Sequence, residues 1–169
     1  DSSVICEYID ETFPDPPLVP ADRVARARLR AWMRFVEEVP TSAVRVPSFH
    51  VMAPQRLANL SDEAFETEEA RRRPLRTHFY RKMGRHGFTE AEVQVALEEL
   101  DLTLRRMEGV LVGGGPWLLG NAFTLADTLV LPTVDRMDDL CLSGMWTGHY
   151  PEVTGWYAHD AAVHYLSPR

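Results

Sequence analysis

The fold is decided by the stretch Trp117-Leu-Leu-Gly120-Asn-Ala-Phe123-Thr-Leu-Ala-Asp127. Thr124 and Asp127 have the spacing of a capping box, in which a Thr hydroxyl and a carboxylate each pair with a free amide at the start of a helix. An apolar run over residues 129–134 follows. The stretch therefore predicts a helix beginning at Thr124, and the same spacing gives Asp127 a role in folding rather than in catalysis.

A second capping box lies upstream, in Thr89-Glu-Ala-Glu92. The apolar residues after it recur at spacings of four and three: Val93, Leu97, Leu100, Leu104, Met107 and Leu111. This is the period of a helix with one face in the core. Glycines at 113–115 end the pattern, which predicts a helix of about five turns.

The first residues predict a helix from Ser2 to Phe13, because their apolar side chains recur with the helical period. The predicted buried face consists of Val4, Ile5, Tyr8, Ile9 and Phe13. Four prolines between residues 14 and 20 cannot continue a helix, and they predict an extended linker over residues 14–21. A long helix rich in Arg is expected from Asp22, until Pro40 kinks or ends it.

The remaining sequence adds helices and no strands. Residues 59–85 are polar and weakly periodic, with a short helix expected near Asp62 to Arg73. A last amphipathic helix is expected after Pro151. No stretch of useful length alternates between apolar and polar residues as a strand does, so the chain is predicted to be all-α.

The composition argues against several classes of function. The chain has 169 residues and a formal charge of −7, whereas binding a phosphate backbone requires clustered Lys and Arg. No run approaches the ~20 apolar residues of a membrane span. Two cysteines, Cys6 and Cys141, form no disulfide framework, which favours a reducing, cytoplasmic location. His159 and His164 are five positions apart, on different helix faces, so no metal site is predicted.

Three features, in chain order, resemble the cytosolic glutathione S-transferase superfamily. The run Asp1-Ser2-Ser3-Val4-Ile5-Cys6-Glu7-Tyr8-Ile9 is similar to the start of the last helix in the family's thioredoxin-like domain. The second feature is the Pro-rich linker before an Arg-rich helix that contains Trp32. The third is the deciding stretch itself, which is similar to the family signature Gly-x-x-Phe-Thr-x-Ala-Asp. The first two features are also similar to the bacterial β-etherase branch, whose members cleave lignin-type aryl ethers.

The resemblance implies a glutathione transferase C-terminal-like helical bundle, with the thioredoxin-like α/β domain missing except for its last helix. That helix would occupy residues 1–13, the linker residues 14–21 and the all-helical domain residues 22–169. Because the chain begins in mid-motif without an initiator Met, we expect further residues to precede Asp1 in the full protein. The resemblance also implies a homodimer, formed through the first helix and the long helix after the linker.

The function implied by the resemblance is enzymatic: a glutathione S-transferase that conjugates glutathione to a hydrophobic electrophile, with aryl ethers as one candidate class. Glutathione is the implied cofactor, and Asp1 and Ser2 are its expected contacts. A helix start and a Ser hydroxyl suit the glutamyl carboxylate, and an acidic residue before them suits the ammonium group. From the residues alone, Ser2 could instead be an N-cap and Asp1 a helix-dipole residue. The alternative function is a non-catalytic binding or assembly module of the same fold.

In the family, the residue that activates the thiol lies before the position of Asp1, so no catalytic residue is predicted in this chain. The resemblance places the electrophile pocket beside the long helix after the linker. The candidates for its walls are Trp32, Phe35, Arg45, Phe49, His50 and Met52. Aromatic walls would suit an aryl substrate, and Arg45 could stabilise a departing phenolate. Each of these side chains could instead belong to the core or to the surface.

Overall fold

The structure, a computed structural model, describes residues 2–57, 61–64, 67, 79, 82 and 87–166. The helices in these residues are α1 (Ser2–Thr12), α2 (Arg23–Glu38), α3 (Pro40–Ala43), α4 (Arg45–Leu57), α5 (Asp62–Ala64), α8 (Glu90–Leu111), α9 (Leu125–Asp139), the 3-10 turn η3 (Ser143–Met145) and α10 (Pro151–Leu166). The described residues contain no strand, so the predicted all-α fold is confirmed. Of the helix expected near Asp62 to Arg73, most lies outside the described residues.

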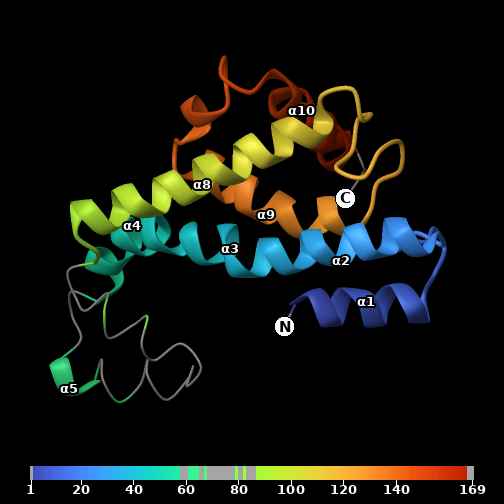
Figure 1. Ribbon diagram of the computed structural model, residues 1–169. Helices are drawn as coiled ribbons and strands as arrows, with labels where there is room; N and C mark the ends of the chain where they lie inside the picture. The colour runs from blue at the N-terminus through green and yellow to red at the C-terminus, as the bar shows by residue number, and fades with distance from the viewer. Residues whose placement is uncertain are drawn as a thin grey trace.

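The core lies where α2, α8, α9 and α10 meet. In Figure 1, α2, α3 and α4 follow one another along one side of the bundle, α8 runs across them, and α9 passes between. The four core helices α2, α8, α9 and α10 each contribute fully buried side chains, among them Leu29 of α2, Val130 of α9 and Val153 of α10. The core residues of α8 include Leu100, Leu104, Met107 and Leu111, as its pattern predicts. None of the described helices is long and apolar enough to cross a membrane.

The helix boundaries follow the local chemistry of the sequence. Thr89 and Thr124 each form the predicted capping box, at the start of α8 and of α9. The Asp22 side chain caps α2 by accepting from the backbone N–H of Ala25 at 2.8 Å. α2 ends at Glu38, and Pro40 is the first residue of α3, where its missing N–H costs nothing because that amide has no helical partner.

The predicted buried face of the first helix is wrong. The five apolar side chains in question are 50% to 72% exposed: Val4, Ile5, Tyr8, Ile9 and Phe13. Polar contacts hold α1 in place instead, together with Cys6, which packs against the core. Asp10 is buried and accepts from the backbone N–H groups of Leu18 (2.6 Å) and Val19 (3.2 Å) in the linker. The helical period identifies an apolar face but not its partner, and in α1 the polar face is the one turned toward the rest of the chain.

Candidate functional site

The start of α1 is fastened to the last turn of α2. The Glu37 carboxylate oxygen Oε1 accepts from the backbone N–H of Ser3 at 3.3 Å and also from the Ser3 hydroxyl. A carboxylate is favoured at this place because a helix N-terminus carries partial positive charge. Further along the two helices, Arg30 and Glu7 form an ion pair at 3.0 Å. Together these contacts fix the position of the α1 N-terminus on α2, and Figure 1 shows the two helices side by side.

Ser2 occupies the exposed end of this arrangement. It is the first residue of α1, and its hydroxyl makes no hydrogen bond with any residue that the structure describes. Asp1, the other expected glutathione contact, lies outside the described residues. The structure therefore presents one exposed hydroxyl at a helix N-terminus whose neighbouring residue, Ser3, is already bonded to Glu37.

Sequence reasoning missed Glu37. It lies 34 residues from Ser3, in a helix where an acidic residue among arginines has the look of an ordinary surface group. The available signal was indirect, because the free amides at the start of a helix require an acceptor and a tertiary contact can supply one. Glu37 takes the Ser3 N–H away from any incoming anion. It also places negative charge where the ammonium group of a ligand would be attracted.

The aromatic candidates on α2 pack toward α8. Trp32 is only 4% exposed, and its ring meets that of Phe35 edge to face with centroids 5.7 Å apart. The Arg106 guanidinium of α8 lies over both rings, 4.6 Å from the Trp32 centroid and 4.1 Å from that of Phe35. Such cation–π stacking is favourable because the ring face carries partial negative charge.

The candidates on α4 have different neighbours. The Phe49 ring meets that of Phe79 edge to face, with centroids 5.5 Å apart. The Met52 sulfur accepts from Arg136 of α9 at 3.0 Å. His50 lies against Gly87, and its buried Nδ1 has no hydrogen-bond partner among the residues that the structure describes.

The contacts described for these candidates fall into two sets. Trp32 and Phe35 share Arg106 of α8, whereas Phe49 and Met52 contact Phe79 and α9, respectively. Arg45 is half-buried at the first position of α4.

Asp127 is placed as a structural anchor. It is fully buried, and its two oxygens accept four hydrogen bonds of 2.9 to 3.0 Å. The donors are the backbone N–H groups of Leu118 and Thr124, the Thr124 hydroxyl and the Trp156 indole N–H. A carboxylate so fully used has no role left in proton transfer. Across the described part of the chain, no group of three or more His, Cys, Asp and Glu side chains is arranged to hold a metal ion.

Comparison with known proteins identifies the family. The family model described as Glutathione S-transferase, C-terminal domain, matches residues 68–159, which is more than half of the chain. The chain belongs to the glutathione S-transferase family. The predicted superfamily is thereby confirmed, and the deciding stretch from Trp117 to Asp127 lies inside the match.

Individual relatives narrow the comparison. Protein LigF of Sphingobium sp. is 27% identical over 130 residues, covering 75% of this chain and 50% of LigF. A probable glutathione S-transferase of Glycine max is 38% identical over 66 residues, covering 39% of this chain and 29% of the soybean protein. The chain thus spans about half the length of LigF, and less of the soybean protein.

A solved structure shares the fold. The crystal structure of the beta-etherase LigF from Sphingobium sp. aligns with a TM-score of 0.80 and 23% sequence identity, covering 96% of this chain and 69% of that one. At this identity the likeness shows a common fold. It confirms the glutathione transferase C-terminal-like architecture, and the expected similarity to the β-etherase branch is confirmed as a similarity to LigF.

Proposed function

We propose that the full protein is a glutathione S-transferase that joins the glutathione thiolate to a hydrophobic electrophile. The observation that carries the proposal is the fixed N-terminus of α1, where Ser3 is bonded to Glu37 and Ser2 is left exposed. Membership of the glutathione S-transferase family supports the same cofactor. The proposed contacts are the Ser2 hydroxyl and the first-turn amides of α1 other than that of Ser3 with the glutamyl carboxylate, and Asp1 with the ammonium group.

The rest of the glutathione site is proposed to come from residues that precede Asp1 in the full protein. The exposed apolar face of α1 supports this, because side chains such as Tyr8, 67% exposed, and Val4, 64% exposed, need a covering surface. A thioredoxin-like domain packed on that face would bring its thiol-activating residue near Ser2. Residues 1–13 would then complete that domain, and residues 22–169 would form the helical one.

The electrophile is proposed to be an aryl ether. The similarity to LigF, whose solved structure is described as a beta-etherase, supports this class. Phe49 and His50 would line the aryl group, and Arg45 would stabilise the departing phenolate.

A homodimer located in the cytoplasm is part of the proposal, and light scattering on the full-length protein tests its mass. The two cysteines, Cys6 and Cys141, are unpaired, in keeping with a reducing compartment.

The test is glutathione binding by the full-length protein, measured by isothermal titration calorimetry. Ser2→Ala is expected to weaken binding about tenfold, because a hydrogen bond to a charged group contributes roughly 1.5–3 kcal/mol. Its melting temperature should not change. Ser3→Ala is the matched control, since it removes the hydroxyl bonded to Glu37. It should lower the melting temperature and have little effect on the glutathione affinity.

A folded wild-type protein that does not bind glutathione would refute the transferase proposal and favour the non-catalytic module. If glutathione binds, release of a phenol from a model aryl ether tests the narrower assignment. Arg45→Gln should slow that release most for the phenols of highest pKa, because those carry the most localised charge as they leave. Equal slowing for all phenols would contradict the role of Arg45.

A further inference from the structure

Arg136 of α9 reaches across to α4 with two parts of its guanidinium group. Its Nε–H donates to the Ser48 hydroxyl at 3.2 Å, and its Nη2 donates to the Met52 sulfur at 3.0 Å. The remaining Nη1 donates to Asp139 of its own helix at 3.2 Å. A guanidinium presents its N–H groups in a rigid planar fork, so three partners fix its orientation. Arg136 therefore forms a defined link between α9 and α4.

The Ser48 hydroxyl is used on both sides of this link. Ser48 is buried, and its hydroxyl donates to the Val44 carbonyl at 2.7 Å while it accepts from Arg136. Because the hydrogen points at a fixed carbonyl, the accepting side of the oxygen is held toward α9. The ion pair of Arg34 and Glu38 differs, since it is exposed and lies within α2. The Arg136 link thus belongs to the packing of two helices.

The link sets the rotation of α4 about its own axis. Ser48 and Met52 are four positions apart and therefore lie on one stripe of the helix. Phe49 lies about 100° around the axis from Ser48, and His50 lies about 200° around it. A rotation that moved the stripe away from α9 would turn both side chains of the proposed aryl wall.

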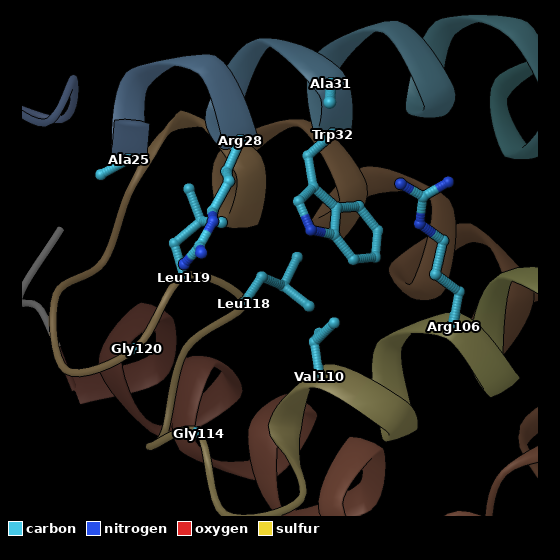
Figure 2. A pocket seen from close by; sticks show the side chains of 10 residues that line it. All are labelled: Ala25, Arg28, Ala31, Trp32, Arg106, Val110, Gly114, Leu118, Leu119 and Gly120. Atoms are coloured by element: carbon cyan, nitrogen blue, oxygen red, sulfur yellow. The ribbon is translucent and has the colours of Figure 1, made fainter. Parts of the chain in front are cut away.

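Another arginine crosses between helices in a different way. Arg106 of α8 lies over the Trp32 ring of α2, 4.6 Å from its centroid, and Figure 2 shows the two side chains beside each other. Attraction to a ring face tolerates sliding across that face. The hydrogen bonds of Arg136 depend on angle as well as on distance. Of these two links, the one made by Arg136 is therefore suited to fixing the rotation of a helix.

We propose that Arg136 is a positioning residue for the electrophile pocket. It holds α4 in the rotation that presents Phe49 and His50 to an aryl group, and it does not touch the substrate. The inference rests on the aryl-ether pocket of the proposed function and adds the residue that orients its wall. Without Arg136, α4 samples other rotations. If the competent rotation were populated about a tenth of the time, the apparent affinity for an aryl ether would fall about tenfold.

The experiment measures the binding of diphenyl ether to the full-length protein in the absence of glutathione. Arg136→Gln is expected to weaken this binding about tenfold. Its glutathione affinity should not change. With a cleavable aryl ether, the KM should rise while kcat stays the same, because the bound substrate selects the competent rotation. Arg34→Gln is the control, since Arg34 is paired within its own helix, and all four quantities should stay at the wild-type values.

A double-mutant cycle tests the route through α4. Ser48→Ala should weaken diphenyl ether binding less than Arg136→Gln does, because the bond from Arg136 to Met52 remains. The double variant should bind no more weakly than Arg136→Gln alone, since residues that act through one contact are not additive. Ser48→Ala keeps the test decisive if Arg136→Gln does not fold.

Unchanged diphenyl ether binding by Arg136→Gln, or by Ser48→Ala where only that variant folds, would overturn the inference. A glutathione affinity that falls by the same factor would also overturn it, because that pattern indicates a general loss of structure. Fully additive losses in the double variant would show that Arg136 does not act through Ser48.

The two proposals fail in different ways. A folded wild-type protein that binds diphenyl ether but not glutathione would refute the transferase proposal, and the variants at Arg136 and Ser48 would still test the inference. A wild-type protein that binds glutathione but not diphenyl ether would overturn the inference and leave the transferase proposal in place.

Discussion

Helices α8 and α9 begin with the same device in different surroundings. At the start of α8, Glu92 accepts from the backbone N–H and the hydroxyl of Thr89, each at 2.9 Å, and pairs with Lys82 at 3.0 Å. At the start of α9, Asp127 accepts from the same two groups of Thr124, each at 3.0 Å. The first box lies at the surface, whereas Asp127 is fully buried.

Burial changes what the second box does. The Asp127 oxygen that does not serve the cap accepts from the Leu118 N–H and the Trp156 indole, which belong to the loop before α9 and to α10. One carboxylate thus connects three segments of the helical domain. The comparison shows that a capping box at the surface organises its own helix, while the same box in the core also determines how distant helices meet.

Asp127→Ala tests the difference between the two capping boxes most strongly. The substitution removes the cap and leaves the Leu118 and Trp156 donors buried without an acceptor, each costing about 1–3 kcal/mol. We expect a loss of about 4 kcal/mol in the free energy of unfolding, measured by urea denaturation.

Glu92→Ala is the matched control, since its donors can turn to water, and it should cost much less than Asp127→Ala. Equal losses for the two substitutions would contradict the difference drawn between the boxes.

The contact between Asp127 and Trp156 can be tested by itself, with a smaller expected effect. Trp156→Phe keeps an aromatic ring in α10 and removes the N–H that donates to Asp127 at 3.0 Å. We expect a loss of about 1.5–3 kcal/mol, because the deleted bond is made to a charged group and the smaller ring leaves a gap. The capping geometry of Thr124 should persist, so the helix content measured by circular dichroism should not change. A loss of helix content at native conditions would show that the cap and the Trp156 contact are not separable.

The fold was accessible from the sequence because its strongest signals are local. Both capping boxes, the period of α8 and the stop at Pro40 depend on residues within a few positions of each other. The burial of the capping box at Thr124 could not be predicted, because it depends on Trp156, 29 residues after Asp127. The prediction of a buried apolar face on α1 was wrong for the same reason, since the helical period of Val4 and Tyr8 does not specify a partner.

The site could be predicted from the sequence less well than the fold. Ser2 was proposed from a family resemblance, and nothing near it in sequence indicated that Glu37 would bond to Ser3. The six wall candidates were chosen by position along one stretch, whereas the contacts of Trp32 with Arg106 and of Phe49 with Phe79 depend on residues far away in the sequence.

The smallest expected effect concerns pH and the surface box. The backbone N–H of Thr89, the Lys82 ammonium and the Thr89 hydroxyl lower the pKa of Glu92 from 4.5 to about 2. A lowered pKa in the folded state means that the ionised form stabilises the fold. This contribution is complete above about pH 4.5 and is lost as the pH falls toward 2.

Glu92→Gln tests the sign of this effect, because the amide oxygen can still accept from Thr89 but carries no charge. The wild-type chain should melt at a higher temperature than the variant at pH 6, and the two melting curves should converge between pH 4.5 and 2. The buried carboxylates are common to both proteins, so their acid sensitivity cancels in the difference. A gap in melting temperature that persists unchanged at pH 2 would mean that shape, and not charge, makes Glu92 the better partner for Thr89.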